Sequence, residues 1–425
     1  MAAQMAADAA CDERENKRAN TGSQCWSATF PEDLLVLIYT MIASPRGRSC
    51  FAAACRSWRA AAHAAPPVPA LPRLLFSHGK ETTMKALYCL EDGAFMHLKV
   101  PEIIIGGHDG GWIAGVALSG LVRIVNLFSG AEVALDEKKA TIVCPSPHHA
   151  RGNPVVISRV VFSAAPTSSL CILAAVTQNC GIALCKIGCP NNGWAVQGCH
   201  NNNRQLVDIT FCNGKLYGLY SKRKLVRFEI RVGEGGAPRI TAEHRLVMRR
   251  IDRTIRTDDY RDIASYIFNL DGKLAMALKA RWLPNIPPFF KVFKLVDIHM
   301  VKSKTRYYKD KWMEVTSLGD QSLFLGKSFS KAVHVPANMC GLVERNRIYY
   351  SHYCWLGINT NIPSDKVFLK ISNGSGSMTC YKEDDSKNTI TDDDDAMKRI
   401  MSVGYFMQGG LHGGMWIFPP NMHLV

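Results

Sequence analysis

The sequence lacks any uninterrupted apolar run that approaches the roughly 20 residues needed by a membrane-spanning helix. The best candidate, residues 112–128, is broken by Arg123 and alternates between apolar and polar positions as a strand does. Residues 1–24 lack an apolar core as well, because charged side chains recur from Asp8 to Arg18. We therefore predict a disordered, alanine-rich lead-in over residues 1–24 rather than a secretory signal, and no membrane partner.

The 15 cysteines lack the regular spacing of a disulfide framework, and their number is odd. This usage favours a reducing compartment, so we expect the protein in the nucleus or the cytoplasm. Cys180, Cys185, Cys189, Cys199 and His200 offer good zinc chemistry, but no pair has the two-residue spacing of a zinc knuckle. We interpret these cysteines as small core residues and expect no metal.

Catalytic motifs are missing too. The sequence has no Gly-x-Ser-x-Gly elbow, and Gly326-Lys327-Ser328 lacks the rest of a phosphate-binding loop, since Gln321 stands where its first glycine would be. Residues 323–325 before it are typical of a buried strand. We expect no catalytic residue and no cofactor, and thus a protein that is not an enzyme.

Acidic residues are outnumbered, with 51 Lys and Arg against 36 Asp and Glu, a net charge of +15. Such a charge favours acidic partners in general. The basic residues are nevertheless spread along the chain, and the densest group, residues 245–256, has no zinc-finger or RNA-binding signature beside it. We interpret that group as a solvated face, which disfavours nucleic acid as a partner.

The stretch from residue 30 to residue 58 is the clearest helical pattern. Acidic residues follow Pro31, at the positive end of the helix dipole, and a Ser44-Pro45 pair ends the first helix. Apolar residues recur three or four positions apart on two stripes. So small a unit covers too little of its own surface, so we expect apolar area to remain for a partner. The stripes comprise Leu34, Leu35, Ile38 and Ile42, and then Phe51, Ala54, Cys55 and Trp58.

A proline-rich linker over residues 65–73 separates this helical pattern from a longer region with strand periodicity. Two-residue turn signals at Asp92-Gly93, Asn213-Gly214 and Asp271-Gly272 lie between apolar alternating segments and predict hairpins. Further turn centres are expected near residues 129–130, 179–181, 319–320 and 346. Long helical patterns are scarce, so this region is predicted to be all-β: a β-propeller with blades of about 40 to 50 residues, or a pair of β-sandwiches.

The helical stretch resembles an F-box, the small module that docks on a Skp-type adaptor of SCF ubiquitin ligases. The resemblance rests on Phe30-Pro31-Glu32-Asp33-Leu34-Leu35 followed by Cys55-Arg56-Ser57-Trp58-Arg59, with Phe30 where leucine is usual. An ordinary helical hairpin at the edge of a larger core is the alternative interpretation.

The remainder resembles the C-terminal region of a large plant F-box family, described as a KIB-type β-propeller. The matching segments include Gly111-Trp112-Ile113, residues 208–217, residues 312–326 and Trp416-Ile417-Phe418-Pro419. The loop over residues 381–396, with its four consecutive aspartates, departs from the family pattern.

The resemblance implies an α+β multidomain chain: an F-box over residues 25–64 and, over residues 74–425, a substrate-recognition domain that is a six- or seven-bladed β-propeller. It implies a non-catalytic substrate receptor of an SCF-type E3 ubiquitin ligase, joined through a Skp-type adaptor to a cullin and recruiting an unknown protein for ubiquitination. The implied adaptor-facing or adaptor-supporting residues are Phe30, Pro31, Leu34, Leu35, Ile38, Ile42, Cys55 and Trp58.

Aromatic residues in turn-like contexts are the candidates for substrate contact. They are Trp194, Tyr260, Trp282 and Phe289. The alternative function is a basic β-propeller that binds nucleic acid or an acidic protein without any ligase role. Salt-sensitive nucleic-acid binding would distinguish it from the adaptor-dependent receptor.

Overall fold

The computed structural model describes residues 30–42, 44–66, 70–77, 84–100, 103–117, 119–135, 137–146, 149–178, 181–189, 193–197, 206–221, 224–246, 264–280, 289–297, 310–335, 343–351, 367–373, 376–384, 400–408 and 414–420. The chain divides into two compact units. One comprises residues 1–69 together with 421–425, and the other comprises residues 70–420. The expected lead-in over residues 1–24 lies outside the described residues.

The first unit contains three short helices: α2 (Glu32–Met41), α3 (Pro45–Ala54) and α4 (Arg56–Ala64). Pro31 precedes α2, and the first turn of that helix carries Glu32 and Asp33. The predicted break at Ser44-Pro45 is confirmed, because α2 ends at Met41 and Pro45 begins α3. Ser44 caps α3: its Oγ accepts a hydrogen bond from the Gly47 N–H at 3.3 Å.

The core of this unit is small. Leu35 and Tyr39 of α2 are buried, and so is Phe51 of α3. The Phe51 ring lies 5.5 Å from the Tyr39 ring and 4.4 Å from the Trp58 ring, measured between centroids. None of the helices in the described residues is long and apolar enough to cross a membrane.

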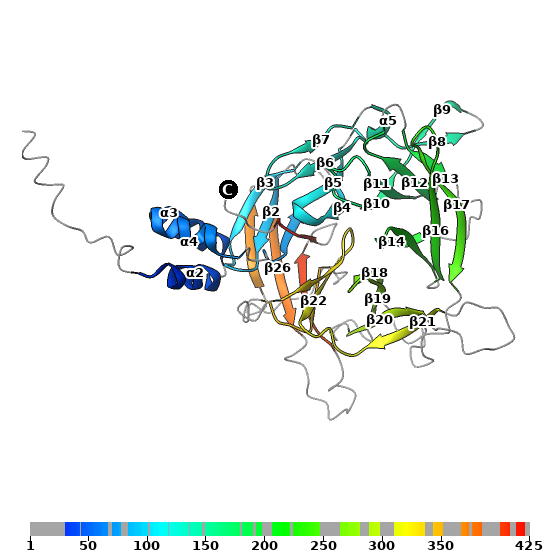
Figure 1. Ribbon diagram of the computed structural model, residues 1–425. Helices are drawn as coiled ribbons and strands as arrows, with labels where there is room; N and C mark the ends of the chain where they lie inside the picture. The colour runs from blue at the N-terminus through cyan, green and yellow to red at the C-terminus, as the bar shows by residue number, and fades with distance from the viewer. Residues whose placement is uncertain are drawn as a thin grey trace, which may run out of the picture. The chain divides into compact units, whose positions relative to one another are not determined.

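The second unit consists mainly of five four-stranded antiparallel sheets, arranged around a common centre (Figure 1). In spatial order, the first sheet consists of β28 (Met415–Ile417), β1 (Arg73–Ser77), β2 (Met84–Cys89) and β3 (Phe95–Lys99). The second consists of β4 (Ile103–His108), β5 (Trp112–Val116), β6 (Val122–Asn126) and β7 (Glu132–Val133). The third consists of β10 (Ile157–Phe162), β11 (Ile172–Thr177), β12 (Gly181–Lys186) and β13 (Ala195–Gln197). The next two are β14 (Leu206–Cys212), β15 (Lys215–Tyr220), β16 (Lys224–Val232) and β17 (Pro238–Leu246); and β18 (Ala264–Leu270), β19 (Lys273–Ala280), β20 (Phe289–Asp297) and β21 (Asp310–Val315).

A six-stranded mixed sheet adjoins them, with β22 and β24 paired in parallel and β24 and β27 likewise. Its order is β23 (Lys331–His334), β22 (Gln321–Gly326), β24 (Arg347–Ser351), β27 (Met401–Gln408), β26 (Gly376–Asp384) and β25 (Val367–Asn373). The smaller elements are η2 (Asp109–Gly111), α5 (Glu137–Ala140) and the hairpin of β8 (Val143–Ser146) and β9 (His149–Pro154).

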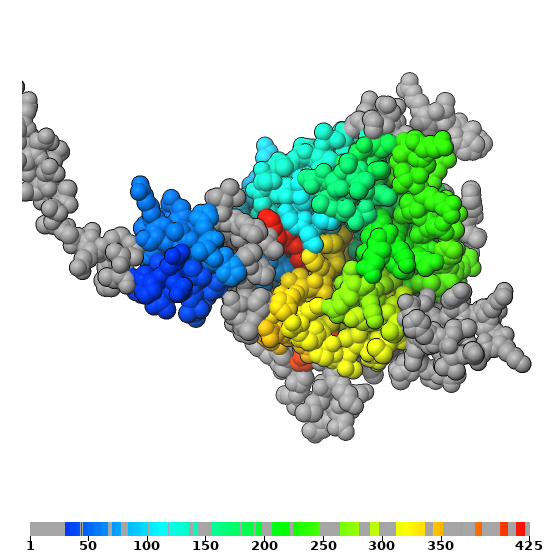
Figure 2. Space-filling view, viewed as in Figure 1, coloured from blue at the N-terminus to red at the C-terminus, as the bar shows by residue number. Residues whose placement is uncertain are grey.

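This arrangement is a β-propeller, as predicted, rather than a pair of sandwiches. Strands β4, β10, β14 and β18 are the innermost strands of successive sheets, and each contacts the next. In Figure 2 the colours run from cyan through green to yellow around this unit, so sheets that are neighbours in the sequence are neighbours in space. Apolar side chains fill the space between adjacent sheets; one such cluster joins Leu219 and Leu225 to Phe293 and Trp312.

The two ends of the propeller meet in one sheet. Strand β28 pairs with β1 in antiparallel fashion, and Trp416 lies opposite Leu74. The Trp416 side chain is fully buried, and its Nε1–H donates a hydrogen bond to the Leu325 carbonyl at 3.1 Å. One side chain from the last strand thus fastens the first sheet to β22.

The predicted hairpin turns form where glycine follows a residue that tolerates positive φ. Asn213 and Gly214 have φ of 49° and 70°, and Asp271 and Gly272 have φ of 51° and 73°, as two-residue turns require. The Asn213 amide donates to the Gly272 carbonyl at 2.6 Å, which ties these turns of neighbouring sheets together. The hairpins expected near residues 319–320 and 346 are wrong. The first turn links β21 to β22, which lie in different sheets, and β24, which follows residue 346, pairs with β22 and β27 rather than with β23.

Candidate functional site

Helix α2 presents an exposed apolar face. The exposed fractions of its side chains are 40% for Phe30 just before the helix, 45% for Leu34, 54% for Leu37, 39% for Ile38 and 66% for Met41. Spacings of three and four residues put these side chains on one side of the helix. We call these five residues the α2 face.

The opposite side of α2 is what holds the helical unit together. Leu35 and Tyr39 are only 2% and 3% exposed. Burial raises the pKa of the Tyr39 hydroxyl, an effect that the positive charge of Arg48 opposes. A three-helix unit has too little interior to bury both sides of α2, so the α2 face stays open.

The sequence-predicted adaptor residues therefore divide into three groups. Phe30, Pro31, Leu34 and Ile38 are exposed, Leu35 is buried, and Ile42, Cys55 and Trp58 are half-buried. The sequence-based prediction missed Leu37 and Met41. Leu37 lies three residues after Leu34 and Met41 three residues after Ile38, so both belong to the same helical stripe.

The predicted substrate-contact residues do not come together among the described residues. Trp194 is half-buried, and its Nε1–H donates to the Lys139 carbonyl at 2.7 Å, where the ring packs against an apolar cluster. Phe289 is the first residue of β20. Tyr260 and Trp282 lie outside the described residues.

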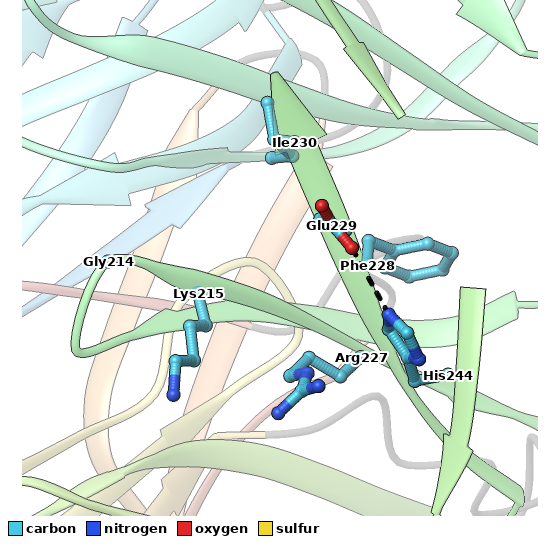
Figure 3. A pocket seen from close by; sticks show the side chains of 7 residues that line it. All are labelled: Gly214, Lys215, Arg227, Phe228, Glu229, Ile230 and His244. Atoms are coloured by element: carbon cyan, nitrogen blue, oxygen red, sulfur yellow. Dashed lines mark hydrogen bonds and ion pairs between the residues drawn. The ribbon is translucent and has the colours of Figure 1, made fainter. Parts of the chain in front are cut away.

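A pocket of about 360 Å³ lies on the sheet of β14–β17 (Figure 3). Its polar side chains come from three adjacent strands, and Figure 3 shows the Arg227 side chain extending toward the side on which Lys215 lies. The lining residues are Gly214, Lys215, Arg227, Phe228, Glu229, Ile230 and His244. Register places Arg227 of β16 directly opposite His244 of β17, so the two share one face of the sheet.

Glu229 is the acidic member of this group, and both of its carboxylate oxygens are occupied. Arg231 Nη2 lies 3.0 Å from Oε1, and His244 Nε2 lies 3.3 Å from Oε2. Hydrogen bonds from His244 and Arg231 hold the pKa of the Glu229 carboxyl below its usual value. The pocket can therefore offer positive charge to a ligand, with its own carboxylate already engaged.

The described residues contain no group of three or more His, Cys, Asp or Glu side chains that could hold a metal ion. Of the cysteines considered for zinc, Cys185 is buried in β12, and the Cys189 thiol donates to the Gly235 carbonyl at 3.1 Å. Cys180, Cys199 and His200 lie outside the described residues. Residues 323–325 form a buried strand, as predicted, so Gly326-Lys327-Ser328 follows core sequence rather than a glycine-rich loop.

Solved structures similar to this one share little sequence identity with it, and one of them is named as a β-propeller domain. The N-terminal domain of Nup159 shares 10% identity at a TM-score of 0.31, with 59% of this chain matched to 62% of that domain. The Myceliophteria thermophila Cps50 (Swd1) β-propeller domain shares 9% identity at a TM-score of 0.32, with 63% of this chain matched to 82% of that chain. The computationally designed Ika8 protein shares 8% identity at a TM-score of 0.29, with 63% of this chain matched to 98% of that chain.

A comparison with curated proteins finds no match. The family model for the KIB1-4 β-propeller matches residues 87–382, which is most of the propeller unit, and it names no catalytic activity. With five four-stranded sheets around one centre and this match over more than half of its length, the chain belongs to the KIB1-4 β-propeller family.

Proposed function

We propose that this protein is the substrate-receptor subunit of an SCF-type ubiquitin ligase. Helices α2–α4 form an F-box that docks on a Skp-type adaptor and, through it, on a cullin. The propeller binds a target protein and holds it beside a ubiquitin-charged enzyme in the nucleus or cytoplasm. Other subunits supply the chemistry, and tethering makes the encounter between a target lysine and the thioester effectively intramolecular.

The observation that carries this proposal is the α2 face. Five large apolar side chains, four on α2 and Phe30 just before it, remain exposed, while Leu35 and Tyr39 on the other side of the helix are buried. Full burial of an exposed large apolar side chain contributes about 1.5–3 kcal/mol, and covering the 39–66% of these side chains that is still exposed would contribute a corresponding part of that to binding. The family match of the propeller, a fold that serves as a binding platform, supports the same role.

The domain organisation that we propose follows from this role: an F-box over residues 25–64, a linker over residues 65–73 and a propeller over residues 74–425, with six or seven blades. Five four-stranded sheets account for five blades, and the six-stranded sheet contains strands for one or two more. Within the propeller, Trp194, Tyr260, Trp282 and Phe289 stay proposed substrate contacts.

The test is capture of a purified Skp-type adaptor by the full chain. Leu34→Asp/Leu37→Asp replaces two exposed side chains of the α2 face with carboxylates, and burying these in an interface without partners strongly disfavours binding. We expect capture by the wild type and none by this variant. Leu35 is a poor choice for this substitution because it is buried, so a carboxylate there would unfold the unit.

The matched control is Leu121→Asp/Leu170→Asp, which changes two exposed leucines of the propeller. It should capture the adaptor as the wild type does. Undiminished capture by Leu34→Asp/Leu37→Asp, or no capture by the wild type, would show that α2–α4 is not an F-box. The alternative, a basic propeller that binds an acidic partner without a ligase role, is favoured by the cationic pocket on β14–β17 and would survive that outcome.

A further inference from the structure

One face of β15–β17 carries more positive than negative charge. Lys215, Arg227, Arg231 and Arg239 supply four formal positive charges and Glu229 one negative charge, a net of +3 from 4 − 1. Register puts Arg231 opposite Arg239, and it puts Arg227 opposite both His244 and Tyr217. Lys215 lies two positions before Tyr217 on β15, so these residues share a face. Leu219 and Leu225 on the same face pack against the next sheet, so the charged part is the portion that the neighbouring sheet leaves open.

Within this face, the ion pairs of Glu229 do not involve the two cations that line the pocket, Lys215 and Arg227. Glu229 is engaged by Arg231 at 3.0 Å and by His244 at 3.3 Å. The Lys215 and Arg227 side chains make no hydrogen bond or ion pair with the parts of the chain that the structure describes. Arg227 is half-buried, and its guanidinium can form charge-assisted hydrogen bonds with a bound anion.

The surroundings of the two cations favour a peptide over a nucleic acid. The pocket of about 360 Å³ suits one or a few acidic groups rather than a long phosphate backbone. Single-stranded nucleic acid also needs exposed aromatic rings on which bases stack. The lining ring, Phe228, is only 2% exposed and cannot serve as such a platform.

We propose that the Lys215–Arg227 pocket, defined by the seven lining residues above, binds an acidic side chain of a target protein. The ligand group is a carboxylate or a phosphate, which the two cations recognise by charge-assisted hydrogen bonds. This inference rests on the proposed function, in which the propeller recruits a protein, and it names an acidic segment as the feature recognised.

The experiment uses the full chain and fluorescence anisotropy. The probes are labelled hexaglutamate, a labelled glycine-serine peptide with one phosphoserine, and labelled single-stranded oligo(dT). The variant Lys215→Gln/Arg227→Gln removes both cations. The matched control Lys224→Gln/Arg245→Gln removes one exposed lysine and one exposed arginine from the opposite face of the same strands, since Arg245 pairs with Val226 rather than Arg227.

We expect saturable binding of at least one acidic peptide, with a Kd raised about tenfold or more in Lys215→Gln/Arg227→Gln and within about twofold of wild type in the control. The tighter of the two peptides identifies carboxylate or phosphate as the preferred group. Unchanged melting temperatures verify folding, and Lys215→Gln alone, at an exposed position, serves if the double variant melts early.

Three results would overturn the inference: no saturable binding of either peptide, an equal loss in both double variants, or oligo(dT) binding that is tighter than peptide binding and is lost in Lys215→Gln/Arg227→Gln. The two proposals fail separately. Lys215→Gln/Arg227→Gln should still capture the adaptor, and Leu34→Asp/Leu37→Asp should still bind the acidic peptide.

Discussion

Arg159 Nη1 lies 2.6 Å from Asp208 Oδ1, and this ion pair joins the innermost strands β10 and β14 of two neighbouring sheets. Asp208 Oδ2 also accepts the Ile267 N–H of β18 at 2.9 Å, and Arg159 Nη1 donates to the Lys327 carbonyl, just after β22, at 2.8 Å. A single buried pair therefore contacts four sheets. Burial raises the pKa of the Asp208 carboxyl to about 6, with the Arg159 charge opposing the rise.

Breaking this pair from the arginine side should destabilise the propeller. Arg159→Met leaves the Asp208 carboxylate buried without its counter-charge, which we expect to lower the free energy of unfolding by about 3–5 kcal/mol at neutral pH. Asp208→Asn keeps an oxygen that can accept the Ile267 N–H but removes the negative charge. The double variant Arg159→Met/Asp208→Asn should therefore recover about 2 kcal/mol or more of the loss caused by Arg159→Met alone. Urea unfolding of the four proteins measures this coupling.

The exposed pair Arg123–Glu132, at 2.7 Å, is the control for that cycle. Arg123→Gln/Glu132→Gln should change the free energy of unfolding by no more than about 1 kcal/mol, because solvent screens the pair. If Arg159→Met behaved like this surface variant, the central pair would contribute nothing beyond packing.

The pH dependence of stability should carry the signature of Asp208. Its pKa is raised from 3.8 to about 6 in the folded state, so the folded protein binds the proton more tightly. The stability that this proton provides is complete below pH 3.8 and is lost as the pH rises through about 6. The free energy of unfolding of the wild type, relative to Asp208→Asn, should thus fall by up to about 3 kcal/mol across that window. A flat difference in urea titrations at several pH values would contradict this.

Closure of the propeller should depend on Trp416. Trp416→Ala removes a fully buried indole, its hydrogen bond to Leu325 and its edge contact with the Phe324 ring at 4.9 Å. We expect a loss of about 3–5 kcal/mol in the free energy of unfolding, and faster amide exchange in β1 and β28. Met313→Ala, at a 52% exposed position, should change stability by about 0.5 kcal/mol or less. Equal effects of the two changes would argue against closure through this residue.

Adjacent leucines of α2 should separate folding from docking. Leu35→Ala opens a cavity in the helical unit and should cost about 2–5 kcal/mol, which exchange rates of the α2–α4 amides would reveal. Leu34→Ala removes an exposed side chain, so it should leave those rates unchanged while weakening adaptor capture. If Leu34→Ala changed the exchange rates and Leu35→Ala only weakened adaptor capture, then Leu34 would lie in the core and Leu35 in the docking surface.

Much of the fold was predictable because its signals are local. Asn213-Gly214 and Asp271-Gly272 mark hairpins through the φ values that their own backbones accept, whatever the rest of the chain does. Gly319 has positive φ for the same reason, yet it connects two sheets. Turn chemistry reports a reversal of the chain and carries no information about which strands pair.

The candidate surfaces were predictable only in part. The α2 stripe follows from helical spacing, but spacing alone could not separate Leu34, in water, from Leu35, in the core. The Lys215–Arg227 pocket had no local signal, since its residues come from three strands that register brings together.

The amino-acid sequence by itself determined the helical module, the change to strand periodicity, the positions of the tight turns and the excess of positive charge, because each depends on residues close together in the chain. Only the tertiary structure decided which side of α2 remains exposed, that Trp416 closes the ring beside β1, and that Arg159 meets Asp208 at the junction of four sheets. The exposed side of α2 depends on how the three helices pack, and the other two are contacts between residues far apart in sequence whose geometry exists only once the sheets have packed.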